Sequence, residues 1–229
     1  MSQLLLDLFH RSYFLIVYGI ALMISVKTYR KYFETVFKYL PLIIAYTFLN
    51  ELLGYFIKYY PDFSLFNDIK YSNINEIIYN LYDIVFFPYF YFAYWKLSTN
   101  SENKKRIAWA SSFAILAYLI SCIFQNPMDT MLYYAYFIAS FVLVYCIATN
   151  FIEKKQNNID VVNTYNLVFW INMALIIFYA ISPFLLFIGY TKIEIWNQFH
   201  FALILKILII IMYSILTIGL LLNRKLAFR

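Results

Sequence analysis

Residues 130–152 read TMLYYAYFIASFVLVYCIATNFI and contain no Asp, Glu, Lys or Arg. A helix needs about 20 mostly apolar residues to cross the hydrocarbon core of a bilayer, and this run is long enough. Residues 107–128 and 161–191 also lack all four charged residue types. Three uncharged runs of this length predict an integral membrane protein built from α-helices.

Four further apolar segments extend the pattern on both sides of these runs. The expected spans lie near residues 12–26, 38–57, 76–95, 107–124, 130–151, 165–188 and 199–222. The second and third carry charged residues, so their hydropathy alone is a weaker signal. No linker or soluble domain separates the segments. The sequence therefore predicts an all-α fold, with residues 1–229 forming one seven-transmembrane-helix bundle.

The composition fits lipid better than water. Hydrophobic residues make up 64% of the chain and charged residues only 13%, whereas soluble domains carry about 25% charged residues. The net charge of +6 could suggest nucleic acid, but the basic residues lie at the ends of apolar segments rather than in one patch. The expected partner is the lipid bilayer, and no nucleic acid is expected.

The distribution of Lys and Arg predicts the orientation, because cytoplasmic loops carry the excess of these residues. The segments 27–38, 96–106, 152–164 and 223–229 hold four, four, two and three of them, thirteen in all. The N-terminus and the loops on the other side hold four. This asymmetry alternates correctly with seven spans, and it predicts an outside N-terminus and a cytoplasmic C-terminus.

Several common site chemistries have no sequence signal. Cys122 and Cys146 both lie within expected spans, where free cysteine acts as a small hydrophobe. The chain has two histidines and no HExxH or CxxC pattern, so no metal is expected. It also lacks GxSxG and Gly-rich phosphate motifs, and no cofactor is expected.

Polar residues inside the expected spans are the main functional signal, since charge within a membrane is costly. The candidate ligand-binding residues are Asn50 and Glu51 in the second span, Glu76, Tyr79, Asn80 and Asp83 in the third, and Lys206 in the seventh. Glu76, Asn80 and Asp83 share one helix face. Two other polar residues have simpler interpretations: we expect Asn172 to join helices and His200 to lie at the interface.

Three of these residues have matched depth. Glu51, Asp83 and Lys206 lie six or seven residues from the outer ends of their spans, roughly 10 Å below the surface at 1.5 Å per residue. One hypothesis is a polar pocket open to the outside, floored by these three and walled by asparagines and tyrosines. The alternative is a structural salt bridge without a ligand. Either way, we expect Lys206 within salt-bridge or single-water reach of a carboxylate.

Three short stretches carry a family resemblance. They are Leu40-Pro41-Leu42 leading to Asn50-Glu51 and Gly54, then Ile78-Tyr79-Asn80-Leu81-Tyr82, then Phe169-Trp170-Ile171. With the seven-span layout, they resemble an uncharacterised family of standalone bacterial seven-helix membrane proteins. The layout is also similar to the membrane sensor regions of bacterial histidine kinases. The resemblance implies a multi-pass protein of the bacterial cytoplasmic (inner) membrane.

Microbial rhodopsins are a weaker analogy. They share seven spans, a Lys in the last span and an Asp in the third, parts that Lys206 and Asp83 could play here. Trp170 and Tyr179 could supply the aromatic residues of the sixth span. However, Ala202 stands one turn before Lys206, where those proteins carry an acidic residue. A retinal-binding protein therefore remains an alternative.

The leading functional hypothesis is a sensor or receptor-like protein. It would bind a small or lipid-like ligand in the outward-facing pocket and signal to a protein partner through its basic cytoplasmic face. A second hypothesis is a membrane enzyme acting on a lipid or lipid-linked substrate, with Glu51 or Asp83 as general acid or base. A channel or transporter is the third.

Overall fold

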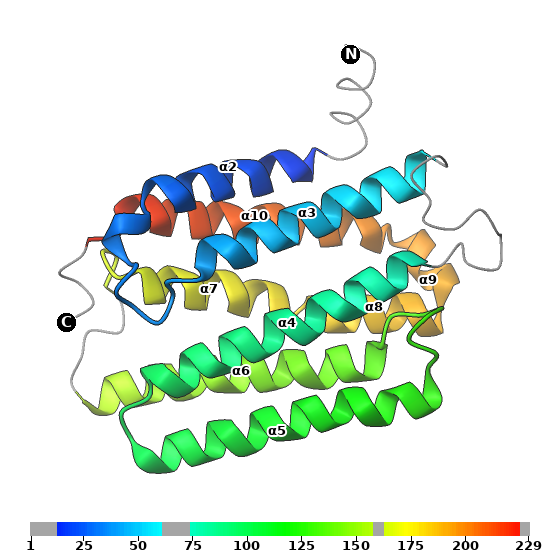
Figure 1. Ribbon diagram of the computed structural model, residues 1–229. Helices are drawn as coiled ribbons and strands as arrows, with labels where there is room; N and C mark the ends of the chain where they lie inside the picture. The colour runs from blue at the N-terminus through cyan, green and yellow to red at the C-terminus, as the bar shows by residue number, and fades with distance from the viewer. Residues whose placement is uncertain (1–12, 61–73, 158–162, 225–229) are drawn as a thin grey trace.

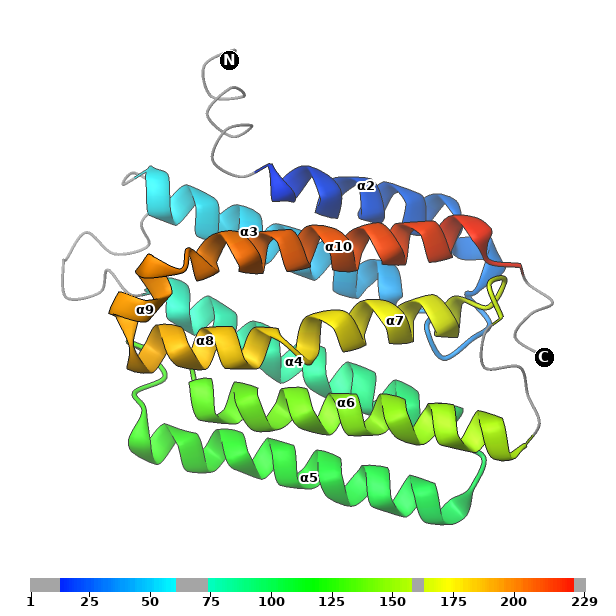
Figure 2. The ribbon, with the colours of Figure 1, turned by 180° about the vertical axis from the view of Figure 1, so that it is seen from behind.

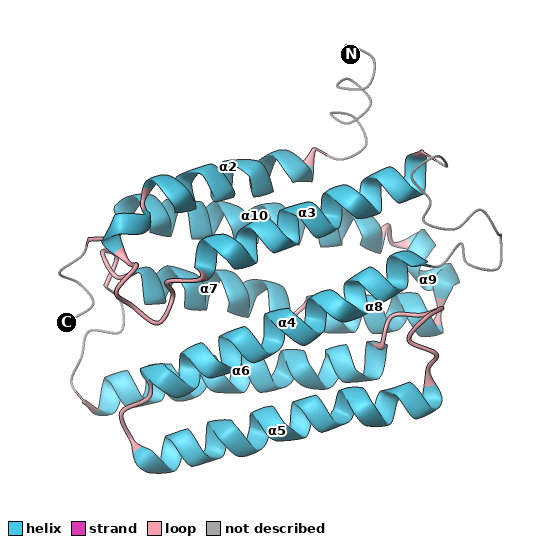
Figure 3. Cartoon of the chain, viewed as in Figure 1, coloured by secondary structure: helices cyan, strands magenta, loops and turns pink. Residues whose placement is uncertain are grey.

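The computed structural model describes residues 13–60, 74–157 and 163–224, with side chains from residue 77 onward in the second range. Every regular element in these ranges is helical (Figure 3). The elements are α2 (Phe14–Lys27), the 3-10 helix η1 (Tyr29–Lys31), α3 (Leu40–Tyr59), α4 (Ile74–Leu97), α5 (Ser101–Phe124), α6 (Tyr133–Gln156), α7 (Leu167–Tyr179), α8 (Ser182–Thr191), α9 (Ile193–Gln198) and α10 (Phe201–Leu222).

The long helices run side by side with their connections at the two ends (Figure 1). Helix α10 packs against both α7 and α2, while α4 packs against α3, α5 and α6. Seen from behind, α2 and α5 lie at opposite edges, with α10, α7 and α6 between them (Figure 2). The described helices pack as one bundle.

Five helical segments in the described ranges are long and apolar enough to cross a membrane. They are Leu40–Tyr59, Ser101–Phe124, Tyr133–Gln156, Leu167–Thr191 and Phe201–Leu222. Helix α2 is apolar but has only 14 residues. Helix α4 is long enough but contains Asp83 and Lys96. The chain is therefore a multi-pass protein of a lipid bilayer.

The expected sixth segment, 165–188, is two helices rather than one. Helix α7 ends at Tyr179 and α8 begins at Ser182. Pro183 has no N–H, so the carbonyl of Tyr179 lacks the donor that an unbroken helix would provide. The short helix α9, which links α8 to α10, was not predicted from the sequence.

Neutral hydrogen bonds join the helices inside the bundle. The Tyr94 hydroxyl of α4 donates to Asn172 Oδ1 of α7 at 2.6 Å. Asn172 Nδ2 then donates to Asn150 Oδ1 of α6 at 3.2 Å, and the Tyr91 hydroxyl donates to the Ala139 carbonyl at 2.7 Å. The expectation that Asn172 joins helices is confirmed.

Helices α7 and α10 approach closely at Gly219. A Cβ atom built on Gly219 would lie 2.2 Å from the Cβ of Trp170. Trp170 cannot easily swing away, because its indole N–H donates to the Thr164 carbonyl at 2.8 Å. Only a residue without a side chain fits this crossing.

The connection between α4 and α5 is held by a buried carboxylate on α6. Glu153 is only 6% exposed and accepts hydrogen bonds from Ser98 Oγ at 2.7 Å, Thr99 N at 2.5 Å, Thr99 Oγ1 at 2.6 Å, Asn100 N at 3.0 Å and Asn103 Nδ2 at 3.0 Å. The carboxylate also lies at the N-terminus of α5, where the helix dipole favours negative charge. Glu153 thus fixes α6 to the start of α5.

Candidate functional site

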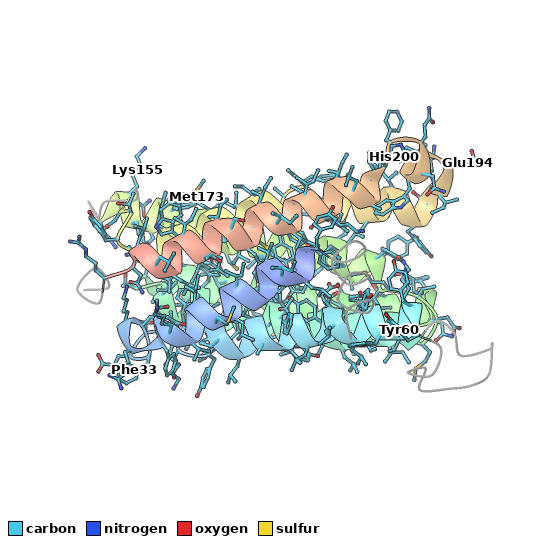
Figure 4. All side chains as sticks on the ribbon, turned by 90° about the horizontal axis from the view of Figure 1, so that it is seen from above. Phe33, Tyr60, Lys155, Met173, Glu194 and His200 are labelled. Carbon is cyan, nitrogen blue, oxygen red and sulfur yellow. The ribbon has the colours of Figure 1, made fainter. Side chains whose placement is uncertain are left out.

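A cavity of about 400 Å³ opens among the helices toward the end of the bundle that carries Tyr60, Glu194 and His200 (Figure 4). Its walls come from α2, α3, α4, α6, α7, α8, α9 and α10. Phe33 and Lys155 mark the opposite end (Figure 4). We call this space the polar cavity, because four ionisable residues line it: Glu51, Lys58, Asp83 and Lys206.

The polar cavity brings together most of the candidate residues. Glu51, Asp83 and Lys206, which were matched only by depth, line the same space, together with Asn50 and Tyr79. They come from α3, α4 and α10, which are distant in sequence. The side chain of Glu76 lies outside the part of the chain whose side chains are described.

Asn80 does not line the cavity, in contrast to the expectation. Its Nδ2 donates to the Pro127 carbonyl at 2.9 Å and to the Thr130 carbonyl at 3.0 Å, and its Oδ1 accepts from Leu132 N at 2.9 Å. These bonds satisfy the amide within the chain. Asn80 therefore anchors the connection between α5 and α6 and is not free to bind a ligand.

Glu51 lies on the α3 wall of the cavity. Its Oε2 accepts a long hydrogen bond of 3.5 Å from the Tyr79 hydroxyl of α4. One turn away, the Thr47 hydroxyl lies 3.1 Å from the Tyr82 hydroxyl. Gly54 leaves the space for Tyr79, since a Cβ there would lie 3.0 Å from its hydroxyl. The α3–α4 wall is therefore held by tyrosines, with a carboxylate among them.

Asp83 is the least satisfied polar residue of the site. Its side chain is 3% exposed, and its Oδ2 has no hydrogen-bond partner among the described residues. The Tyr118 hydroxyl of α5 lies beside this carboxylate, yet it also lacks a described partner of good geometry. A buried carboxylate without compensation is costly. Asp83 therefore lines the cavity with one carboxylate oxygen, Oδ2, unpartnered among the described residues.

Lys206 lies on the α10 wall, beside α2. Its Nζ is 5.9 Å from the centroid of the Tyr13 ring and 5.8 Å from that of Phe14, distances typical of cation–π contact. Among the described residues no ion pair joins Lys206 to Glu51 or Asp83. The direct form of the expected contact is thus absent there, because matched depth fixes the height of a side chain but not the wall it occupies. Contact through a single water stays a prediction.

Aromatic rings form much of the remaining lining. The tyrosines of the cavity are Tyr18, Tyr79, Tyr82, Tyr133, Tyr136, Tyr179 and Tyr213, and Trp196 of α9 joins them. Tyr18 and Tyr213 meet edge to face, with centroids 4.3 Å apart. Tyrosine walls were expected, but which of the 24 tyrosines would face inward depends on helix rotation.

The break between α7 and α8 lies beside the cavity. Phe178 and Tyr179 at the end of α7 and Leu186 of α8 all contribute to the lining. Ser182, at the start of α8, is fully buried, and its hydroxyl lies 3.0 Å from the Tyr136 hydroxyl. Irregular backbone within a membrane is tolerated where it is buried in protein or lines a cavity. The break therefore supports a site here.

The described residues contain no cluster of three or more His, Cys, Asp or Glu side chains placed to hold a metal ion. In the comparisons with known proteins, no family model, no curated protein and no solved structure matches the chain. The resemblance to bacterial seven-helix proteins thus stays a prediction, and the evidence about function comes from the geometry of the polar cavity.

Proposed function

We propose that the chain is a receptor-like protein that binds a small or lipid-like ligand in the polar cavity. The observation that carries this proposal is Asp83, which lines the cavity, is 3% exposed and has one carboxylate oxygen, Oδ2, without a hydrogen-bond partner among the described residues. Small-molecule sites are concave, mostly apolar and equipped with a few convergent polar groups, typically with about 300–1,000 Å³ of space. The polar cavity has this character.

A lipid-like ligand is favoured by the mixed lining. Phe178, Leu186 and Ile209 offer apolar surface, while Glu51, Asp83 and Lys206 offer charge. A ligand with a polar head and an apolar body would contact both. Since all walls are transmembrane or membrane-border helices, such a ligand could reach the site from the bilayer.

The proposal includes seven spans, with the N-terminus outside and the C-terminus in the cytoplasm of a bacterial cell. The thirteen-to-four distribution of Lys and Arg supports it. In this orientation the polar cavity lies toward the outer surface. The basic ends of the helices then face the cytoplasm, where a protein partner would receive the signal.

The orientation can be tested by cysteine labelling in intact cells. In a variant with Cys122 and Cys146 replaced by serine, we expect Met128→Cys to react with a membrane-impermeant maleimide and Lys105→Cys to react only after permeabilisation. Both positions are exposed and lie at opposite ends of α5. Labelling of Lys105→Cys in intact cells would reverse the topology and the side on which the cavity opens.

Ligand binding can be tested with a neutral photoreactive probe, an octyl glycoside that carries a diazirine. We expect cross-links on α8 and α10 beside the cavity, and we expect Ala202→Trp to abolish them because Ala202 lines the cavity. Ala108→Trp is the matched control, since Ala108 is exposed on α5. Unchanged cross-linking in Ala202→Trp would show that the cavity is not a binding site. Chemical conversion of the bound probe would instead favour the membrane enzyme.

A further inference from the structure

The acidic and basic residues of the polar cavity indicate which chemical class of ligand it would bind, an inference that rests on the proposed function. Glu51 and Asp83 contribute carboxyl groups, whereas Lys58 and Lys206 contribute amino groups. Among the described residues, none of these four side chains forms an ion pair with another. Acidic and basic side chains therefore line one space from different walls without pairing with each other among the described residues.

The Asp83 side of the cavity is suited to a cationic group. One oxygen of its carboxyl group has no hydrogen-bond partner within the described ranges, and an ammonium with an N–H would form a strong, charge-assisted hydrogen bond with such an acceptor. Tyr82, Tyr136 and Tyr179 also line the cavity, and aromatic faces attract ammonium groups, including quaternary ones. A carboxylate among tyrosine rings is thus a site for an organic ammonium.

The Lys206 side is suited to an anionic group. The ammonium of Lys206 has aromatic rings beside it but no carboxylate partner in the described ranges. The second lysine of the cavity, Lys58, comes from α3, and its Nζ lies 5.6 Å from the centroid of the Tyr59 ring. A phosphate or carboxylate oxygen would supply an acceptor, which neither ammonium group has among the side chains that the structure describes.

We propose that the ligand is a zwitterionic amphiphile. Its ammonium group contacts Asp83 and Glu51 among the tyrosines, its phosphate or carboxylate group contacts Lys206, and its apolar part lies along Phe178 and Leu186. A ligand of one charge sign would compensate one side of the cavity and leave the other uncompensated. Only a molecule with both signs matches all four side chains.

The same head-group chemistry has two sources, a phospholipid of the bilayer or a free zwitterion in solution. They differ in the contribution of the tail. If the ligand is a lipid, the apolar lining adds affinity, and hexylphosphocholine should bind more tightly than phosphocholine or glycine betaine. If the ligand is a free zwitterion, removing the tail should cost little.

The test compares probes of equal tail length by calorimetry on the full chain in a maltoside detergent. The probes are hexylphosphocholine, hexyltrimethylammonium, hexyl phosphate and hexyl glucoside. We expect hexylphosphocholine to bind at least about tenfold more tightly than either singly charged probe, since its phosphate gains a charge-assisted hydrogen bond from Lys206 and its trimethylammonium group gains electrostatic contact with the carboxylates and tyrosine faces. Equal or tighter binding of a singly charged probe would overturn the zwitterion. Failure of every probe, the neutral glucoside included, would instead remove the proposed function.

Two variants test which side chain contacts the ammonium group of the ligand and which contacts its anionic group. Asp83→Asn should reverse the preference toward hexyl phosphate, and Lys206→Met should reverse it toward hexyltrimethylammonium. Trp109→Phe is the control for general effects, because Trp109 is 77% exposed on α5 and should leave the ranking unchanged. If Asp83→Asn does not fold, Lys206→Met alone still decides. An unchanged ranking in a folded charge variant contradicts the assignment.

Discussion

Replacing Glu153 with alanine should lower the free energy of unfolding by about 3 kcal/mol or more, since one buried and four partly buried hydrogen bonds lose their acceptor together. The carboxylate accepts five hydrogen bonds from residues between Ser98 and Asn103. Two of these donors are backbone N–H groups that have no freedom to seek another partner. The loss should appear in reversible unfolding in mixed micelles and as a lower Tm in detergent.

Two further variants separate this effect from simple loss of charge. Glu153→Gln keeps the shape and one acceptor oxygen but adds a donor, so we expect an intermediate loss. Glu102→Ala removes a carboxylate from the same helix end as the donors, where Glu102 pairs with Arg106 at 3.5 Å on an exposed surface. Such a pair contributes about 0.5 kcal/mol or less. Equal losses for Glu153→Ala and Glu102→Ala would contradict the role assigned to Glu153.

Gly219→Ala should destabilise the bundle by about 2 kcal/mol or more, the range in which overpacking of a close contact falls. The added methyl group would meet the Cβ of Trp170 at 2.2 Å. A Cβ atom cannot move without its backbone, so α7 and α10 would have to separate. The measurement is again Tm in detergent, with size-exclusion chromatography to confirm that the protein is monodisperse.

Gly19→Ala is the matched control, because it makes the same change in another apolar helix. The nearest atom to a Cβ on Gly19 is Phe48 Cε2 at 4.0 Å, an ordinary contact. Alanine is a better helix former than glycine by about 0.5–1 kcal/mol, so Gly19→Ala should raise Tm slightly. Opposite signs for the two alanines would locate the effect in the α7–α10 crossing, whereas equal signs would exclude that explanation.

The fold could be predicted largely from charge spacing. Uncharged runs such as 130–152 have only one stable conformation in lipid, since every backbone polar group must be satisfied internally. Helices therefore begin and end within a few residues of the expected positions, as in α6 (Tyr133–Gln156). The break after Tyr179 was not predicted. Pro183 gave a local signal, but the hydropathy of a segment does not change when one backbone N–H donor is lost.

The candidate site was predicted in part. Depth alone grouped Glu51, Asp83 and Lys206, and all three line the polar cavity. Depth could not show that Asn80 turns to the α5–α6 connection, since that depends on the rotation of α4. Glu153 was missed for another reason. It lies where a span meets the loop region, and a charge there needs no special explanation from sequence.

The hydrogen bonds between α4, α6 and α7 join uncharged groups. Salt therefore affects these contacts less than it affects the charged residues of the protein. Added salt screens net charges but leaves dipolar contacts such as Tyr94–Asn172 and Tyr91–Ala139 almost unchanged. The ionisable acidic and basic side chains of the interior lie elsewhere, on the polar cavity, as with Asp83 and Lys206, and at Glu153 beside the start of α5. Raising the salt concentration should therefore weaken an occupant's contacts at the open end of the cavity more than it loosens the packing of α4, α6 and α7.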